Sequence, residues 1–336
     1  MASNIRPAVL PLSEQFCEPI HVNSSSLYLD AGTGNTKLLL YRMGYWEGKL
    51  VSHCTAVCVR DVAQLDPIMG NHHLDKLASD MVGLYFSSFV DKAVLGATEW
   101  RRRLKPEDPR IEEFCTKLRA NGVDIVALDA QTEAGYEAVA IRFALELYSM
   151  YTKEDLGCEY YVSAGGGSLQ FGSIHGDART SFPIKVKEFS DQIWVKSLGQ
   201  EGDVLASFDA HCSDLQRVFF GQPPLEEGTV LCMGSFFYSA KETRMANVPD
   251  KYQTYPIQEV LGEMKARLET YRHAVVNAPK TISKKEVRAY VALRVNFVFL
   301  HTVVGGHARI LFKRDWAIGE NTLRTTWTFG HFLSSL

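Results

Sequence analysis

The sequence of 336 residues lacks a long hydrophobic run and lacks an excess of charge of either sign. No apolar stretch approaches the roughly 18–20 residues that a helix needs to cross a bilayer. The 36 Lys and Arg residues nearly balance 39 Asp and Glu residues, which gives a formal net charge of −3. Such a small charge argues against a protein drawn to nucleic acid or to a membrane surface by bulk electrostatics.

Cysteine is also scarce, and the seven cysteines show no metal-binding spacing. The sequence has no Cys-x-x-Cys pair, and the odd number of cysteines argues against a disulfide framework. Residues 1–26 lack the basic start and the apolar stretch of roughly 7–15 residues that mark a secretory signal peptide. We therefore expect a cytoplasmic protein in which residues 1–26 form a loop or a tail.

Two apolar runs within residues 27–41 are separated by a turn of small residues, a pattern typical of a β-hairpin. The glycines of this turn allow consecutive backbone N–H groups to converge on one anion. Asp30, at the end of the first run, offers the hard oxygen ligand that a divalent cation prefers. An ordinary turn explains this stretch equally well when it is taken alone. The residues of the turn that could hold a phosphate are Gly32, Thr33, Gly34, Asn35 and Thr36.

The same plan recurs at residues 159–174, where the turn between two apolar runs is Gly165-Gly166-Gly167-Ser168. Each glycine-rich hairpin begins a block of alternating strand and helix patterns. One such hairpin is a weak signal. Two of them predict a duplicated α/β domain that binds a nucleotide between its halves.

Polar residues also follow two strands that are predicted from apolar runs. Residues 92–97 read as a buried strand that leads to Thr98, and residues 123–128 read as a second strand. In an open α/β sheet, ligands bind beyond the carboxyl ends of the strands. Glu133 follows the second strand in the first turns of a predicted helix, where a carboxylate is stabilised by the helix N-terminus. Glu133 is therefore either a capping-type acid or a functional one.

The remaining pattern predicts further elements. The strands are expected within 49–60, at 229–234 before an aromatic turn at 235–238, and near 321; the helices are expected at 74–90, 106–119, 257–271 and 284–304 and at the C-terminal end. Gly305-Gly306 is expected to end the helix at 284–304. Residues 182–220 mix strand-like and helical pieces, and residues 241–255 look irregular.

Five blocks of the sequence, taken in order, resemble motifs of the apyrases, the nucleoside triphosphate diphosphohydrolases. For example, Ser163-Ala-Gly-Gly-Gly-Ser-Leu-Gln170 resembles the apyrase block Asp-Leu-Gly-Gly-Gly-Ser-Thr-Gln. Apyrases belong to the superfamily of actin, the heat-shock chaperone ATPases and the sugar kinases. The exopolyphosphatase and guanosine-pentaphosphate phosphatase family is a more distant likeness that shares the two loops and the Glu. The five blocks are residues 30–37, 95–102, 131–137, 163–170 and 327–333.

The resemblance implies an α/β fold of two ribonuclease-H-like (actin-like) domains with a nucleotide cleft between them. The first domain would comprise residues 27–156 plus 322–336, and the second residues 157–321. The implied activity is metal-dependent hydrolysis of terminal phosphates of nucleoside tri- or diphosphates, with Mg²⁺ or Ca²⁺ as the cofactor. No nucleic acid or membrane span is expected.

The resemblance also implies a role for individual residues. Glu133 matches the base that activates water, and Ser168 and Gln170 match residues that position this water. Asp30 matches a carboxylate that holds the metal through water. The phosphates would lie on Gly32, Thr33, Gly34, Asn35, Thr36, Thr98, Gly165, Gly166 and Gly167. Tyr238 and Phe297 fall near the positions whose rings stack on the base, although an aromatic residue at such positions is more often part of the core.

The sequence departs from the apyrase pattern at several positions. Ser163 stands where the family has a second metal-side Asp, and a hydroxyl cannot replace that negative charge. Glu99 and Trp100 replace Ala and Gly in the second block. The alternatives are therefore a catalytically weakened protein that binds nucleotide or phosphate, an exopolyphosphatase-like phosphatase, and a kinase for a small acceptor. The kinase has the least support, because no acceptor-binding signature is seen.

Overall fold

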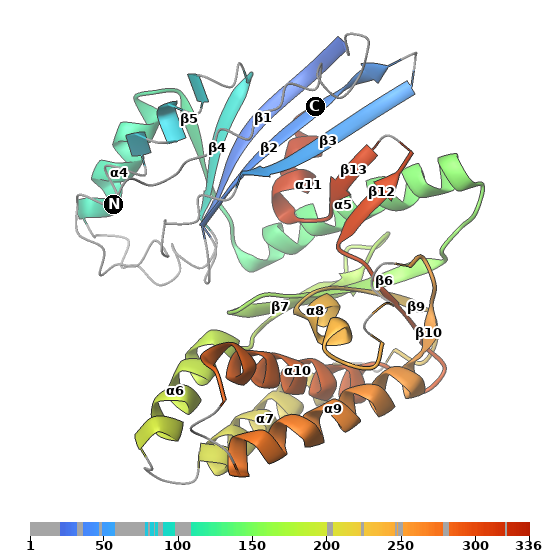
Figure 1. Ribbon diagram of the computed structural model, residues 1–336. Coiled ribbons are helices and arrows are strands. Elements are labelled where there is room, and N and C mark those ends of the chain that lie inside the picture. Colours follow the sequence, from blue (N-terminus) through green and yellow to red (C-terminus); the bar gives the residue numbers. More distant parts are fainter. Residues whose placement is uncertain are drawn as a thin grey trace. The chain divides into compact units, whose positions relative to one another are not determined.

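The chain forms two compact units (Figure 1). Unit 1 extends to Lys153 and resumes at Asp315–Leu336, and unit 2 is Glu154–Arg314. We propose that these units are the two domains of the chain and that the chain returns from the second domain to the first near Asp315. The computed structural model describes residues 21–31, 36–46, 49–57, 78–79, 81–83, 85–86, 90–97, 109–199, 204–222, 225–245, 247, 251–277, 282–319 and 321–336.

A seven-stranded sheet in the order β12-β13-β3-β2-β1-β4-β5 forms the centre of unit 1. The predicted first hairpin is confirmed, because β1 and β2 pair antiparallel up to the pair Ala31 and Thr36. β1, β4 and β5 are parallel to one another. The strands are β1 (His21–Ala31), β2 (Thr36–Trp46), β3 (Lys49–Val57), β4 (Lys92–Ala97), β5 (Val123–Ala127), β12 (Asp315–Ile318) and β13 (Asn321–Arg324).

Alternate residues of β1 face opposite sides of this sheet, as the pleat requires. Leu27 and Leu29 are buried in one apolar cluster with residues of β4 and of α4 (Pro109–Arg119). Tyr28 points to the other face, where it contacts α11 (Trp327–Ser334). The long helix α5 (Ala130–Thr152) packs against α11. The sheet of unit 1 is thus covered on both faces.

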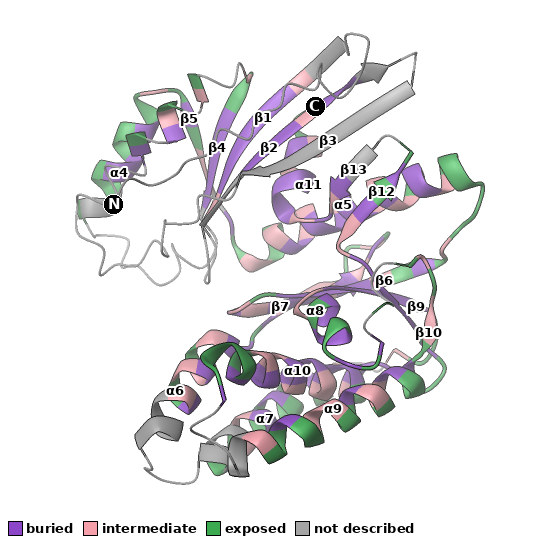
Figure 2. Ribbon diagram, in the orientation of Figure 1, coloured by how far each residue is buried: buried purple, intermediate pink, exposed green. Residues whose placement is uncertain are grey.

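A six-stranded sheet in the order β10-β11-β9-β6-β7-β8 forms the centre of unit 2. β6, β9 and β11 are parallel, and β6, β7 and β8 form an antiparallel meander. Most residues of β6 and β9 are buried (Figure 2). The strands are β6 (Cys158–Ala164), β7 (Ser168–Ser173), β8 (Arg179–Pro183), β9 (Thr229–Gly234), β10 (Tyr255–Pro256) and β11 (Arg309–Phe312).

Helix α10 is the central helix of unit 2, and it packs against the four other helices of the unit. Its start is fixed by a capping box, in which the Ser283 hydroxyl accepts from the N–H of Glu286 and the Glu286 carboxylate accepts from the N–H of Ser283. Phe299 on its buried face contacts the rings of Phe182 and Phe219. The helices are α6 (Val186–Gly199), α7 (Val204–Phe220), α8 (Ser235–Lys241), α9 (Ile257–Asn277) and α10 (Lys284–Val303).

Several sequence predictions need correction or completion. Residues 235–241 form the helix α8, whereas the sequence predicted an aromatic turn there. The unassigned stretch 182–220 contains the helices α6 and α7. The predicted helix at 284–304 is confirmed, and it ends before Gly305 as expected. Of the helix expected at 74–90, residues 78–79, 81–83 and 85–86 are described and are helical, and most of the others lie outside the described residues.

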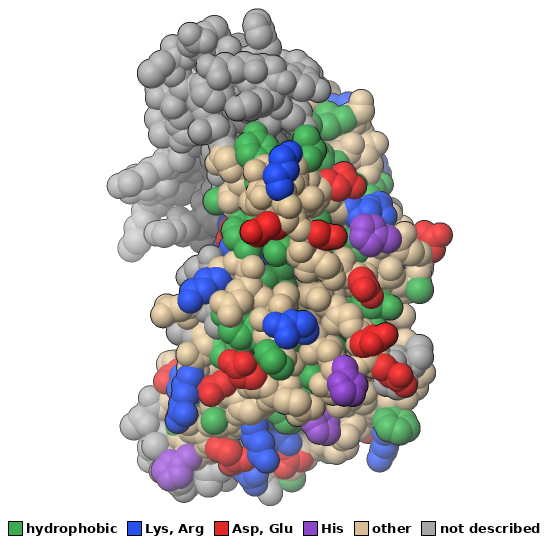
Figure 3. All heavy atoms as spheres, turned by 90° about the vertical axis from the view of Figure 1, so that its right-hand side faces the viewer, with side chains coloured by type: hydrophobic (Ala, Val, Ile, Leu, Met, Phe, Trp, Pro, Cys, Tyr) green, Lys and Arg blue, Asp and Glu red, His purple; other side chains and the backbone are tan. Residues whose placement is uncertain are grey.

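No helix among the described residues is long and apolar enough to cross a membrane. On the face drawn in Figure 3, Lys and Arg side chains are interspersed with Asp and Glu side chains. The described part of this face therefore carries no patch of a single charge, in keeping with the small net charge of the sequence.

Gly330 allows α11 to approach α5 closely. A Cβ atom at residue 330 would overlap the carbonyl oxygen of Tyr136 in α5. Gly135, the neighbour of Tyr136, has open space around the position of its missing Cβ. The two glycines therefore respond oppositely to the same substitution.

We predict that Gly330→Ala lowers the free energy of unfolding of unit 1 by about 1–3 kcal/mol, because overpacking forces α11 away from α5. Gly135→Ala is the matched control and should raise that free energy by up to about 1 kcal/mol, since alanine favours a helix. Urea denaturation of both variants measures the difference. An equal effect of the two substitutions would contradict the close approach of the helices.

Candidate active site

The parallel strands of unit 1 bring two predicted site residues to one edge of the sheet. Asp30 lies opposite Gly96 near the carboxyl ends of β1 and β4, and Ala97 pairs with Ala127 at the end of β5. The chain then enters α5, whose first turns carry Glu133. Asp30 and the start of α5 therefore lie at the same edge, where an open α/β sheet binds its ligand. The predicted phosphate-binding residues Gly32, Thr33, Gly34, Asn35 and Thr98 lie outside the described residues, as does the side chain of Thr36.

The cap of α5 is Asp129 and not Glu133. The Asp129 carboxylate accepts a hydrogen bond of 2.7 Å from the N–H of Thr132. Glu133 stands one residue beyond the N3 position, from which an acid in a capping box reaches back. Its side chain is half-buried in the first turns of the helix. The N-cap of α5 is thus supplied by Asp129, and a role for Glu133 as a functional acid stays a prediction.

The indole of Trp327 orients Asp30. Its Nε1–H donates to Oδ1 of Asp30 over 3.1 Å. The same ring lies where a Cβ atom of residue 96 would be, so only glycine fits beneath it. These three residues lie in separate motif blocks of the sequence, and no local pattern predicts the contact between them. A donor of this kind fixes the orientation of a carboxylate that binds a cation.

A second contact joins β1 to α11. The Tyr28 hydroxyl and Nδ1 of His331 are 2.7 Å apart. Burial raises the pKa of Tyr28, and burial together with the charge of Lys92 lowers the pKa of His331. Both groups are therefore neutral near pH 7, and α11 is held beneath Asp30 by a neutral hydrogen bond.

The second predicted phosphate loop is confirmed as a hairpin at one edge of the unit 2 sheet. Gly165–Gly167 connects β6 to β7, and the N–H of Gly165 donates to the carbonyl of Ser168 over 2.9 Å. The parallel strands β9 and β11 end at this edge, at Gly234 and Phe312. This edge of unit 2 is therefore the equivalent of the edge that carries Asp30 in unit 1.

The carbonyl groups of the loop point toward the start of α6. The Gly166 carbonyl accepts from the N–H of Lys187 over 3.0 Å, and the Gly167 carbonyl accepts from the N–H of Ile184 over 2.9 Å. In a trans peptide, the C=O and the next N–H point in opposite directions. The N–H groups of Gly167 and Ser168 therefore point away from α6, as an anion cradle requires.

Three polar side chains share one face of the sheet beside this loop. Gln170 donates to the Ser168 hydroxyl over 2.9 Å, and Gln170 pairs in register with Ser163 on β6. Gln170 and Ser163 are buried, and Ser168 is half-buried. The structure thus brings together the two predicted water-positioning residues and the serine that replaces the apyrase Asp.

The helix α8 begins at the end of β9 and is fixed by a buried asparagine. Asn296 of α10 accepts from the Ser235 hydroxyl over 3.1 Å and donates to the Ser239 hydroxyl over 2.9 Å. Gly234 has φ +61, and a Cβ atom there would overlap the carbonyl oxygen of Ala164. The start of α8 is therefore held close to the end of β6.

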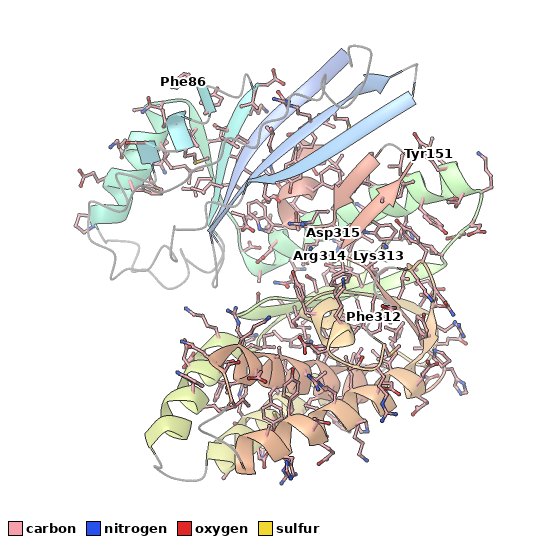
Figure 4. The ribbon with its side chains drawn as sticks, viewed as in Figure 1. Phe86, Tyr151, Phe312, Lys313, Arg314 and Asp315 are labelled. Carbon is pink, nitrogen blue, oxygen red and sulfur yellow. The ribbon has the colours of Figure 1, made fainter. Side chains whose placement is uncertain are left out.

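Tyr238 on α8 is 52% exposed and contacts a cation. Arg314 donates to its hydroxyl, and the guanidinium lies 5.2 Å from the Tyr238 ring and 5.4 Å from the Phe237 ring. Figure 4 shows Arg314 beside Lys313 where the chain leaves β11. The Lys313 amino group lies 4.0 Å from the ring of Tyr252. This part of the edge combines aromatic rings with positive charge.

Phe297 makes packing contacts within unit 2. The ring is partly buried against the core of unit 2 and stacks on His301 with the ring centres 5.7 Å apart. These contacts are those of a packing residue, and a role for Phe297 in binding a base stays a prediction.

A metal would find few protein ligands in the described residues. No group of three or more His, Cys, Asp or Glu side chains lies close enough together there to hold a metal ion. Asp30 contributes one carboxylate, and Ser163 contributes no charge. Mg²⁺ is commonly bound through one or two carboxylates together with substrate phosphates and water. Asp30 fits that mode, in which the substrate supplies much of the coordination.

No known protein-family model matches the sequence, and no curated protein sequence matches it significantly. The chain is similar in structure to the PPX-GPPA enzyme of Aquifex aeolicus, with a TM-score of 0.61 and 15% identity, over 94% of this chain and 100% of that chain. An exopolyphosphatase from Cytophaga hutchinsonii has a TM-score of 0.53 and 13% identity, over 93% of this chain and 99% of that chain. Nucleoside triphosphate hydrolases from Neospora caninum have a TM-score of 0.51 and 10% identity, over 92% of each chain. The chain has the actin-like α/β fold that the sequence predicts.

We predict that Asn296→Ala lowers the free energy of unfolding of unit 2 by about 1–3 kcal/mol, because it removes the buried partner of two serine hydroxyls. Thr270→Ala, on an exposed face of α9, removes a hydroxyl that donates to the Ala266 carbonyl. This control should change the free energy by no more than about 0.5 kcal/mol. Urea denaturation measures both, and equal effects would show that Asn296 does not fix α8.

Proposed function

We propose that the chain hydrolyses the terminal phosphoanhydride bond of a phosphate chain, with Glu133 as the general base. The observation that carries this proposal is the position of Glu133. It follows the carboxyl end of β5 at the edge that carries Asp30, while Asp129 caps the helix. A half-buried carboxylate at the ligand-binding edge of an actin-like sheet is suited to accept a proton from water.

Each group in the proposed reaction has a separate role. Glu133 takes a proton from the attacking water, whose oxygen forms a bond to the terminal phosphorus as the bridging P–O bond breaks. The likeness to apyrases implies that Ser168 and Gln170 position water, and the N–H groups of Gly167 and Ser168 in unit 2 are suited to hold phosphate oxygens. Asp30 would hold a divalent cation, which supplies neutralisation of the phosphate charge. Phosphoryl transfer needs mainly such positioning and neutralisation.

Inorganic polyphosphate is the substrate that we favour. The structural neighbours include exopolyphosphatases, and the chain is covered almost completely by them. A guanidinium already lies near the exposed Tyr238 ring, and the Phe297 ring packs in the core. Both observations weaken the expectation that two rings clamp a base. A cation beside aromatic rings suits a polyanion.

A nucleoside di- or triphosphate is the second candidate, as the likeness to apyrases implies. Tyr238 is 52% exposed and lies on the same edge as the phosphate loop, so it is accessible to a base. The likeness to a nucleoside triphosphate hydrolase also favours this candidate. The two candidates share Glu133 and differ in the role of Tyr238.

We predict that Glu133→Gln lowers the rate of phosphate release by about 10²–10⁴-fold, because the amide cannot accept the proton. Glu146→Gln is the matched control, since Glu146 is an exposed acid on the same helix. It should leave the rate unchanged. The measurement is phosphate release from tripolyphosphate, longer polyphosphate, ATP and ADP with Mg²⁺ or Ca²⁺.

A wild-type rate no higher than that of Glu133→Gln with every substrate would exclude the hydrolase. Ser163→Asp then tests the alternative of a weakened binding protein. Activity that appears only after this substitution would mean that the loss of the second carboxylate abolished turnover.

We predict that Tyr238→Ala changes kcat/KM for ATP and for tripolyphosphate by the same factor, because no base stacks on this ring. A stacking contact is worth about 1–3 kcal/mol per base, which corresponds to roughly 5- to 150-fold. A loss of this size for ATP alone would favour the nucleotide as the substrate.

A further inference from the structure

Lys185 has an unusual backbone conformation beside the phosphate loop. Among the described residues, the non-glycine residues with positive φ are Lys153 at 62° and Lys185 at 46°. Lys153 ends α5, and a left-handed residue at a helix C-terminus is common. Lys185 directly precedes α6, where the residue normally has an extended backbone. The end of a helix therefore explains the positive φ of Lys153, but it does not explain the positive φ of Lys185.

The neighbouring backbone holds Lys185 in this conformation. Its N–H donates to the Gly167 carbonyl over 3.2 Å, and its own carbonyl accepts from the N–H of Phe189 over 3.0 Å. His211 lies 3.3 Å from the carbonyl of Ile184, and its ring stacks on Phe189. Both ends of the residue are thus fixed, and one of them is fixed to the loop itself.

A glycine or an asparagine at position 185 would adopt positive φ at a lower energetic cost than lysine does. Strained residues that the surrounding structure holds in place cluster at ligand-binding sites. Lys185 is exposed, and β8, which leads to it, pairs with β7 so that Pro183 lies opposite Ser168. A positive side chain therefore begins one strand, or about 5 Å, beyond the loop.

We propose that Lys185 binds the phosphate chain of the substrate beyond the group held by Gly165–Gly167, and so favours long chains over short ones. This inference rests on the proposed function, because it requires phosphate on the loop. An ammonium group makes charge-assisted hydrogen bonds to phosphate oxygens. Orthophosphate, which is too short to reach past the loop, should not depend on Lys185.

The test is calorimetric binding of inorganic polyphosphate, tripolyphosphate and orthophosphate to full-length protein carrying Glu133→Gln, which prevents turnover. Lys185→Asn removes the charge and keeps a side chain that tolerates positive φ. We expect it to raise Kd for long polyphosphate by roughly 5- to 10-fold, with little change for orthophosphate. Lys185→Arg should retain the affinity. The denaturation midpoint of Lys185→Asn should be unchanged or higher, since strain is relieved.

Lys153→Asn is the matched control, since it makes the same substitution at the other left-handed lysine. It should leave every Kd unchanged. A Kd for long polyphosphate that is the same in Lys185→Asn as in the parent would overturn the inference and leave the proposed function intact. Dependence on Lys185 without any turnover by wild type would support the inference and contradict the proposed hydrolase. No binding of any phosphate chain would contradict both.

Discussion

The parallel pairing of strands is the constraint on which the candidate site residues of each unit depend. Parallel strands end at the same edge of a sheet, so residues distant in sequence are brought together there. In unit 1, the pairing of β1, β4 and β5 sets Asp30 near the start of α5 and hence near Glu133. In unit 2, the pairing of β9 with β6 and with β11 sets the glycine loop on the same edge as α8 and Arg314. Each unit thus offers one polar edge on an otherwise buried sheet.

Glycines in the motif blocks serve close packing. Gly96 leaves room for the Trp327 ring, and Gly330 leaves room for the backbone of α5. Outside the blocks, Gly234 leaves room for the end of β6. The first of these contacts also allows the indole N–H to reach Asp30. The last motif block therefore acts on the candidate site through packing, because it carries the helix that orients a carboxylate.

The sequence predicted the structure well where the local preference of one residue type decides the backbone conformation. Both glycine-rich hairpins, the helix that ends before Gly305 and the strand before Glu133 were predicted from such patterns. It was a poor guide where the outcome depends on distant contacts. Residues 235–238 lie in a helix, and Asn296, far along the chain, holds the serines of that helix. The four-residue strand β11 takes its place by pairing with β9 and β10.

The contacts of individual side chains were also beyond a reading of the sequence. Nothing local distinguishes Lys185 from other lysines, since its conformation follows from hydrogen bonds to the loop and to α6. The cap of α5 shows the same limit. Asp129 and Glu133 are both plausible acids at a helix start, and only the geometry assigns the cap to Asp129.

The central claim is that the N–H groups of Gly167 and Ser168 bind substrate phosphate, and amide hydrogen exchange tests it most directly. Exchange would be measured for a peptide covering residues 164–169, with and without saturating tripolyphosphate and Mg²⁺, beside a peptide from α9 as the internal control. The account predicts slower exchange in the loop peptide and no change in α9. Unchanged exchange in the loop peptide at saturating tripolyphosphate would contradict it.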